Sequence, residues 1–353
     1  MLGVGMTSIR KEVLMHSHHA QQLSRRRFLG GVTLAGMAGL LGAHPRPVAA
    51  EPPPETTRIR LLQFTSSCQA PLNLSEELLR TEGFTDVQWV SSDDGVVSQF
   101  LAAGTVDLGM NFVGPNLIGL EAGDPAMILA GGHVGCFELV GSDRVRSIRD
   151  LKGKTVAIRG LGGPEHVFLS AMAAYVGLDP QRDITWVRHV TTDTVALFAE
   201  GKIDAFMPFA MMAQELRAKQ IGHVVVNSAV DRPWSQYFCC MIIGHREFIR
   251  QHPVATKRAM RAILKTADLC ALAPERAAQL LVDKGLAKQY AYALQLMQEL
   301  PYGKWRDYNP EDTVRFYALR LHEAGMVKSS PEKLITQGTD WRFLTELKKE
   351  LKG

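Results

Sequence analysis

The sequence has few cysteines for its length, and none of them stands in a pattern typical of a zinc ribbon or a redox motif. Five cysteines occur in 353 residues, without a C-x-x-C pair. The G-x-S-x-G nucleophile motif and the H-E-x-x-H metalloprotease motif are also absent, and no cluster of His, Asp and Glu stands out. The sequence therefore predicts no catalytic residues, no metal site and no cofactor. We expect a protein that is not an enzyme.

The five cysteines also do not form a disulfide framework. Their odd number leaves at least one thiol free in a single chain. Cys239 and Cys240 are adjacent within the apolar run Tyr237 to Ile243, where a bridge between neighbours is geometrically awkward. Buried strand thiols are the interpretation we prefer. The cysteines are Cys68, Cys136, Cys239, Cys240 and Cys270.

No hydrophobic run is long enough to span a membrane. The longest apolar stretch near the N-terminus, Leu29 to Ala43, has 15 residues, five of them glycine, whereas a spanning helix needs about 20 apolar residues. Ser24-Arg25-Arg26-Arg27-Phe28-Leu29 precedes it, and the small residues Val48-Ala49-Ala50 follow. This arrangement resembles a twin-arginine signal, which directs folded proteins across a bacterial inner membrane. We expect export to the periplasm by the Tat machinery, with cleavage near Ala50, rather than a membrane anchor.

The chain shows no excess of basic residues once the predicted leader is set aside. The whole sequence has a net charge of +4, and its first 50 residues carry six Lys or Arg and one Glu. The remaining 303 residues therefore have a net charge of −1. A nucleic-acid partner is not expected.

The rest of the chain predicts two α/β units and a helical end. After a proline-rich tether (51–57), strand-like and helix-like segments alternate twice, over residues 58–110 and 155–226, which predicts parallel sheets flanked by helices. A helix from Pro164 to Tyr175 begins with proline at its first position. Further helices are predicted at Pro253–Leu272, Pro274–Lys284, Gln289–Glu299, Glu311–Ala324 and Trp341–Leu351.

Five short phrases in a fixed order carry a family resemblance. They are Cys68–Leu72, Gln99–Gly109, Ile148–Ile158, Gly177–Pro180 and Gly201–Phe206. The chain resembles the substrate-binding proteins of ABC importers in the nitrate/sulfonate/taurine and THI5-like group. The resemblance implies a two-lobe periplasmic-binding-protein fold of type II, with the C-terminal helices packed on the first lobe. It implies that residues 58–135 and 236–353 form lobe 1 and that residues 136–235 form lobe 2. It also implies a small-molecule ligand, a membrane permease as partner and a monomer.

Loops that follow the carboxyl ends of the predicted strands are expected to hold the ligand. The loop Arg159 to Pro164 is the leading candidate, because its glycines let a ligand approach the backbone and Arg159 can pair with an anion. Aromatic side chains near the strand ends favour an aromatic or heteroaromatic ligand, with a sulfonate or a carboxylate as alternatives. The predicted ligand-binding residues are Ser66, Gln69, Asp93, Asn111, Phe112, Cys136, Arg159, Gly162, Gly163, His166, Thr191, Phe209 and Trp234.

Two other functions remain open. Some THI5-like proteins synthesise a thiamine pyrimidine and carry a C-C-C-F-C stretch, of which this chain has only Phe238-Cys239-Cys240. An enzyme of cytoplasmic biosynthesis would also not need an export leader. The same fold could instead serve as the ligand-sensing input of a receptor kinase.

Overall fold

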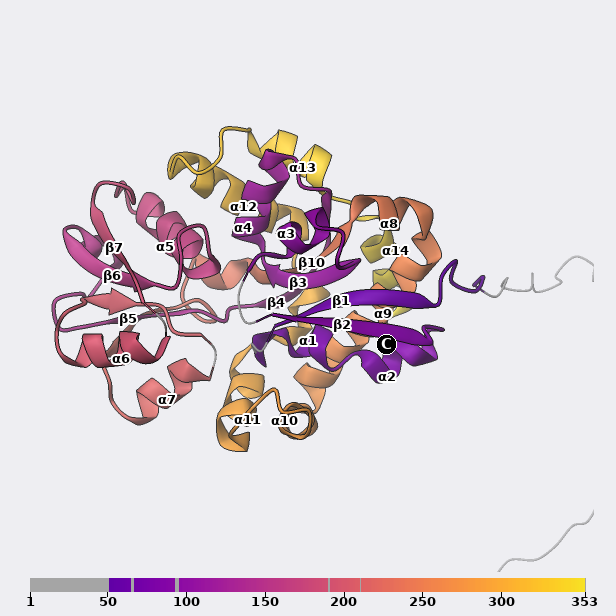
Figure 1. Ribbon diagram of the computed structural model, residues 1–353, viewed down its shortest axis with the longest axis horizontal. Helices are drawn as coiled ribbons and strands as arrows, with labels where there is room; N and C mark the ends of the chain where they lie inside the picture. Colours follow the sequence, from indigo (N-terminus) through magenta and orange to yellow (C-terminus); the bar gives the residue numbers. More distant parts are fainter. Residues whose placement is uncertain (1–50, 65–66, 93–94, 190, 210, 353) are drawn as a thin grey trace, which may run out of the picture. The chain divides into compact units, whose positions relative to one another are not determined.

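The computed structural model describes residues 51–64, 67–92, 95–189, 191–209 and 211–352. The predicted export leader lies outside the described residues, and so do Ser66 and Asp93 of the predicted ligand site. The described chain forms two five-stranded sheets with helices on their faces (Figure 1). The predicted α/β class is confirmed.

The first sheet has the strand order β2-β1-β3-β10-β4. Strand β1 pairs in parallel with β2 and β3, whereas β10 runs antiparallel to both β3 and β4. In β1 the buried positions alternate with less buried ones at its start, as expected for a strand covered on its faces by helices. The strands are β1 (Arg58–Phe64), β2 (Asp86–Ser92), β3 (Leu108–Phe112), β4 (Ala126–Val134) and β10 (Phe238–His245).

The second sheet repeats this plan with the order β7-β6-β8-β5-β9. Its strand β5 runs antiparallel to β8 and β9, and β6 pairs in parallel with β7 and β8. In each sheet the antiparallel strand is the one that enters from the other sheet. The chain therefore crosses twice, at residues 135–137 and 228–237. The strands are β5 (Glu138–Gly141), β6 (Lys154–Ile158), β7 (Ile184–Arg188), β8 (Ala205–Phe206) and β9 (His223–Asn227).

An aspartate occupies the same position in each of the two sheets. The Asp107 carboxylate accepts the backbone N–H of Arg60 in β1 at 2.7 Å, and the Asp204 carboxylate accepts that of Thr155 in β6 at 2.9 Å. Each aspartate also forms an ion pair of 2.6 Å with an arginine, Arg60 or Arg144. The aspartates thus hold the start of a strand to its neighbour, and β3 and β8 begin one residue after them.

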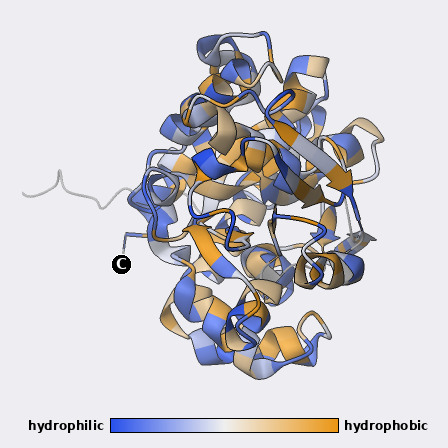
Figure 2. Cartoon of the chain, turned by 90° about the vertical axis from the view of Figure 1, so that its left-hand side faces the viewer, coloured by the Kyte–Doolittle hydropathy of each residue, from blue (hydrophilic) through white to orange (hydrophobic). Residues whose placement is uncertain are grey.

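Helices cover both faces of the first sheet. Figure 1 shows α1 and α2 on one side and α3 and α4 on the other. The helices α9 and α14 belong to the C-terminal part; α9 packs against α1, α2 and β4, and α14 packs against α9 and β4, as predicted for the first lobe. Helix α12 contacts α5 beside the second sheet as well. Figure 2 shows polar and apolar residues in turn along the helices, as expected where one face of a helix packs on the core.

The helix bounds agree with the sequence pattern most closely where proline or glycine marks an end. Helices α5 and α9 have the predicted bounds, and Gly177 follows α5 with a φ of +83°. The α-helices are α1 (Ala70–Asn73), α2 (Glu76–Thr81), α3 (Val97–Ala102), α4 (Val113–Ala122), α5 (Pro164–Tyr175), α6 (Thr191–Ala199), α7 (Met212–Ala218), α8 (Arg246–Gln251), α9 (Pro253–Leu272), α10 (Pro274–Asp283), α11 (Tyr290–Glu299), α12 (Pro310–Glu323), α13 (Pro331–Gly338) and α14 (Arg342–Glu350). Short 3-10 helices lie at η1 (Ser67–Gln69), η2 (Ile148–Leu151), η3 (Trp234–Gln236) and η4 (Tyr302–Trp305).

The segment predicted as a tether lies against α9. The Glu55 carboxylate accepts the backbone N–H groups of Val254 and Ala255, at 3.0 and 2.9 Å, in the first turn of that helix. The carbonyl of Pro52 accepts a hydrogen bond from Arg258. The boundary of each lobe stays a prediction. Among the described helices, none has both the length and the apolar character needed to cross a bilayer.

Candidate functional site

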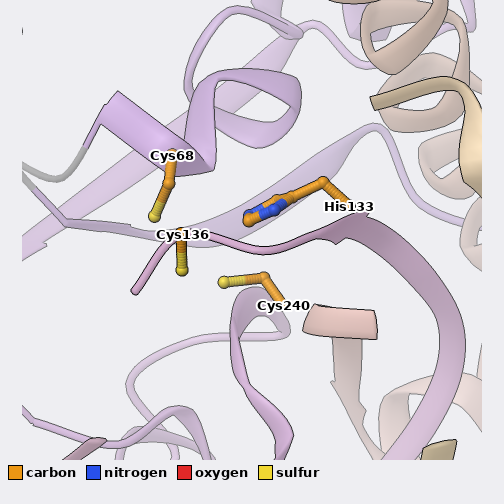
Figure 3. A group of neighbouring side chains, drawn as sticks. All are labelled: Cys68, His133, Cys136 and Cys240. Atoms are coloured by element: carbon orange, nitrogen blue, oxygen red, sulfur yellow. The ribbon is translucent and has the colours of Figure 1, made fainter. Parts of the chain in front are cut away.

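Three cysteines and one histidine come together where the chain crosses between the sheets. Cys68 lies in η1 just after β1, His133 near the end of β4, Cys136 in the link between β4 and β5, and Cys240 in β10. Their ligand-type atoms all lie within 4.8 Å of one another. Figure 3 shows the three sulfurs and the imidazole ring directed toward a common point. We call these four residues the cysteine–histidine cluster.

Strand pairing brings two members of the cluster onto one face of the first sheet. Cys240 and His133 are direct partners across β10 and β4, so their side chains lie side by side. The register shifts between Phe238 and Cys240, which leaves Cys239 as an extra residue on β10. Such a bulge re-aims side chains that strict alternation would send to opposite faces. Both neighbouring cysteines can thereby approach Cys136.

Cys136 is the centre of a network of thiols. Its sulfur lies 2.8 Å from the sulfur of Cys239, and the hydroxyl of Ser228 accepts the backbone N–H of Cys136 and of Phe137 at 3.2 and 3.0 Å. These bonds fix the link between the two sheets. The described structure has no disulfide, and all five cysteines are in the reduced state.

His133 is fully buried, with one ring nitrogen satisfied and the other not. Its Nδ1 lies 3.3 Å from the carbonyl oxygen of Val134. A carbonyl can only accept, so Nδ1 carries the proton. The Nε2 atom has no hydrogen-bond partner among the described residues. In the neutral ring this nitrogen holds a lone pair, as a metal ligand requires.

The thiols and the imidazole shift one another's acidity. Hydrogen bonds with Cys136, Cys239 and Cys68 lower the pKa of Cys240 well below its usual range. Burial raises the pKa of Cys136 well above its usual range. Burial opposes the charged form of His133, but the charges and contacts of Cys240 and Cys68 together outweigh it and raise the pKa of His133. The arrangement favours one thiolate in the group.

No sequence motif marks this cluster, because its four residues are far apart in the chain. The only local signals are His133-Val134-Gly135-Cys136, two ligand types three residues apart, and the adjacent pair Cys239-Cys240. Cys136 belonged to the predicted ligand site. Cys68, His133 and Cys240 did not.

A second candidate site lies at the end of β6, where the glycine-rich loop begins. A small hollow there is lined by Arg159, Glu165, Phe206, Met207 and Phe209, among others. Its free volume of about 20 Å³ is roughly the space that one water molecule needs. In the conformation described, a larger ligand would require the hollow to open.

Arg159 already has an anionic partner in this hollow. Its Nε lies 2.7 Å from the carboxylate of Glu165, which is 3% exposed. Its guanidinium lies over the ring of Phe209, 3.8 Å from the centroid, in the geometry of a cation–π contact. A ligand anion would have to share the guanidinium with Glu165.

The glycines and His166 shape the loop itself. The Gly162 N–H donates to Nδ1 of His166 at 3.0 Å, and the His166 ring lies edge-on to Trp186. Burial lowers the pKa of His166, so the neutral ring that accepts this bond is favoured. Gly162 has a φ of +78°, a conformation that side chains rarely adopt, and a side chain at Gly163 would lie 3.2 Å from the carbonyl of Gly160.

Two predicted aromatic ligand residues lie in an aromatic core. Phe112 is 1% exposed and makes edge contacts with Phe137, Phe168 and Tyr317. Trp234 is 2% exposed and packs on Phe168. Their faces are therefore occupied by other side chains in this conformation. The rings come from β3, the link between the sheets, α5, η3 and α12, so they join the two parts of the chain.

The remaining predicted residues are spread over several loops. Gln69 is buried, and its Oε1 has no hydrogen-bond partner among the described residues. Asn111 uses its Oδ1 to accept the backbone N–H of Phe112 at 2.5 Å. Thr191 begins α6, and its side chain lies outside what the structure describes. The positions of these residues do not show whether they bind a ligand, so the ligand site remains a prediction.

Comparison with known proteins agrees with the two-sheet architecture. The sequence profile described as "NMT1/THI5 like" matches residues 80–277, more than half of the chain. The chain belongs to the NMT1/THI5-like family. One relative, the 4-amino-5-hydroxymethyl-2-methylpyrimidine phosphate synthase THI5 of Saccharomyces cerevisiae, is 25% identical over 234 residues. That match covers 60% of this chain and 67% of the yeast protein.

Solved structures of ABC-transport binding proteins share the fold of this family member. The periplasmic nitrate-binding protein NrtA from Synechocystis PCC 6803 has a TM-score of 0.70 at 16% identity, covering 85% of this chain and 90% of NrtA. The alkanesulfonate-binding protein SsuA from Xanthomonas axonopodis pv. citri, bound to MOPS, has a TM-score of 0.63 at 19% identity. That match covers 80% of this chain and 96% of SsuA. The periplasmic-binding-protein fold is therefore confirmed.

Proposed function

We propose that this protein is the periplasmic receptor of an ABC importer, which binds a small molecule and delivers it to a membrane permease. One observation carries the proposal. Each of the two sheets contains one antiparallel strand that enters from the other sheet, and the nitrate-binding and alkanesulfonate-binding proteins share this fold. Two crossings let two units close on a ligand as a hinged pair.

The twin-arginine leader supports the periplasmic location. It lies in residues 1–50, with Ser24-Arg25-Arg26-Arg27-Phe28-Leu29 before the apolar run. A receptor that captures solutes for a permease acts on the outer side of the inner membrane. The proposed route is export as a folded protein, followed by cleavage near Ala50.

The glycine-rich loop is the proposed anchor of the ligand. Arg159 offers a guanidinium that can hold a carboxylate or a sulfonate by two hydrogen bonds, and Phe209 beneath it offers an aromatic face. The two groups together favour an aromatic or heteroaromatic ligand that carries an acidic group. Opening of the hollow would release Arg159 from Glu165 in part.

Ligand screening by thermal shift and calorimetry tests this proposal. The panel comprises aromatic carboxylates and sulfonates, pyrimidines, alkanesulfonates, nitrate and sulfate. We expect binding of an aromatic acid, weakened by about 10-fold or more in Arg159→Gln, since hydrogen bonds to charged groups contribute about 1.5–3 kcal/mol. Arg182→Gln is the control, because Arg182 is an exposed arginine at the opposite end of the same sheet. Tight binding of inorganic anions alone would contradict the aromatic ligand.

Failure to bind any solute, with none co-purifying by native mass spectrometry, would contradict the receptor role itself. Neighbouring genes provide a separate check. An adjacent permease and ATPase would support import, whereas an adjacent receptor kinase would favour a sensing role.

A second candidate function is pyrimidine synthesis, favoured by the 25% identity to the yeast synthase THI5. Incubation of the purified protein with pyridoxal phosphate, followed by mass spectrometry, tests it. Formation of a pyrimidine phosphate would establish the enzyme and replace the receptor assignment. Unchanged pyridoxal phosphate would leave the receptor role preferred.

A further inference from the structure

The cysteine–histidine cluster offers the donor set of a tetrahedral thiolate-rich metal site. Three thiols and one imidazole nitrogen lie within 4.8 Å of one another. In a tetrahedral zinc site with Zn–S bonds of about 2.3 Å, neighbouring ligand atoms lie about 3.5–3.8 Å apart. Side-chain adjustments of about 1 Å would therefore bring all four atoms to bonding distance.

We propose that Cys68, His133, Cys136 and Cys240 bind one Zn²⁺ ion. Thiolate and imidazole ligands in a tetrahedral arrangement favour zinc over the hard cations Mg²⁺ and Ca²⁺, which take oxygen ligands. The Cys₃His set fills all four positions, so the site is closed and structural rather than catalytic. It does not depend on the transport role or on the solute.

The unpartnered nitrogen of His133 points independently to a ligand. His133 is fully buried, and a polar atom that lacks a partner at such a depth is costly. Its Nδ1 proton bonds the Val134 carbonyl, the outer-shell contact that orients a metal-binding histidine and leaves Nε2 to coordinate. A zinc ion at the centre of the cluster would satisfy Nε2.

The location indicates what the ion would do. The four ligands come from the turn after β1, the end of β4, the link to the second sheet and the strand β10 that returns from it. One ion would thereby join both crossings to the first sheet. Because such a site forms only in the folded chain, its binding free energy adds to folding stability.

The leader is compatible with loading of the ion before export. Thiols stay reduced in the cytoplasm and can be oxidised in the periplasm. A protein that crosses the membrane folded could carry the ion with it. Coordination would then protect the three thiols from forming disulfides with one another or with Cys239.

Metal analysis of the full chain, purified under reducing conditions, tests the site. We expect one zinc per chain by mass spectrometry of the metal, and an X-ray absorption spectrum that fits three sulfurs and one nitrogen. Replacement by Co²⁺ should give the strong visible bands of a tetrahedral thiolate complex. Loss of a residue that only hydrogen-bonds to a metal ligand lowers metal affinity by about 10–100-fold. Cys68→Ser and Cys240→Ser each remove a proposed direct ligand, so each should weaken zinc binding by more than about 100-fold.

Two control variants keep the test independent of folding. Cys270→Ala removes a buried cysteine of α9 that is not part of the cluster, and Cys239→Ser removes the neighbour of Cys240. Both should retain one zinc. If Cys239→Ser alone lost the metal, the assigned ligand set would be wrong.

The wild-type protein by itself can also overturn the proposal. A Cys136–Cys239 disulfide in the protein as isolated would remove one ligand and contradict the site. So would a protein with free thiols that binds no zinc at micromolar concentration, or that binds Cu⁺ but not Zn²⁺.

Discussion

Arg217 joins two carboxylates that belong to different parts of the chain. Its guanidinium lies 2.5 Å from Glu138 in β5 and 2.7 Å from Glu299 in α11. Glu138 is buried, and burial raises its pKa, which the charge of Arg217 opposes. Arg217 therefore links the second sheet to the C-terminal helix α11. Without Arg217 the buried Glu138 carboxylate would lack a counter-ion, which is unfavourable.

Arg217→Ala should destabilise the protein by about 2 kcal/mol, somewhat less than the 3–5 kcal/mol for breaking a fully buried pair, because Arg217 is partly exposed. The reason is the unpaired Glu138 carboxylate. Denaturant unfolding measures the change. The double variant Arg217→Ala with Glu138→Gln should recover part of the loss. A double variant as unstable as Arg217→Ala would show that lost packing, not charge, is the cause.

Gly135→Ala should destabilise the protein far more than Gly104→Ala. Both glycines have a left-handed φ, +64° and +67°, so both variants incur backbone strain of about 1–2 kcal/mol. A side chain at Gly135 would also lie 2.4 Å from the Cα of Ala229, whereas Gly104 has open space around it. We expect a further loss at Gly135 of at least about 2 kcal/mol, in the range of severe core overpacking.

Chemical unfolding of the two glycine variants side by side provides the measurement. Equal losses would mean that the second crossing, which includes Ala229, can move away from Gly135. In that case the two crossings would not be tightly packed against each other.

His166→Gln should reduce the acid sensitivity of the protein. Burial lowers the folded-state pKa of His166 below 6.5, the usual value, and the neutral ring accepts the Gly162 N–H. The unfolded chain then binds the proton more readily than the folded chain does. The stability that neutral His166 contributes is therefore fully present above about pH 6.5 and is lost as the pH falls through the lowered folded-state pKa. Glutamine can accept the same bond without titrating.

Melting temperatures between pH 7.5 and pH 5 test this sign. The wild type should lose more stability over that interval than His166→Gln, as the pH moves through the titration range of histidine. His322→Gln, at an exposed position of α12, should follow the wild type. Parallel curves for all three proteins would show that the loop around Gly162 does not depend on neutral His166.

Phe112→Ala should cost about 3–5 kcal/mol, the usual range for a buried phenylalanine. Its ring contacts three other aromatic rings and is 1% exposed. Phe112→Leu, which keeps most of the volume, should cost less than about 2 kcal/mol. Calorimetric screening of Phe112→Leu for ligand binding then separates a packing role of Phe112 from a role in ligand binding. Unchanged affinity would assign Phe112 to packing alone and remove it from the predicted ligand site.

The sequence predicted α5 and α9 where proline or glycine marks their ends, but it missed α13 (Pro331–Gly338), which also begins with proline and ends with glycine. Pro164 and Gly177 bracket α5, and Pro253 and Pro274 bracket α9, because proline and glycine act on the backbone within one turn. The helix α4 escaped prediction, since Gly114 and Pro115 stand in its first turn and are typical of a loop. The alternation of strand-like and helix-like segments over residues 58–110 and 155–226 indicated two similar sheets, and Asp107 and Asp204 make corresponding contacts in the two.

By itself, then, the sequence determined the α/β class, the likeness of its two halves and the family, because each depends on residues that are close together in the chain. The export leader stays a prediction. Only the tertiary structure decided which side chains meet. Cys68, His133, Cys136 and Cys240 are separated by up to 172 positions and converge because β10 lies between β3 and β4. Strand order and a one-residue bulge at Cys239 produce that convergence. They result from long-range pairing, which leaves no spacing pattern in the sequence.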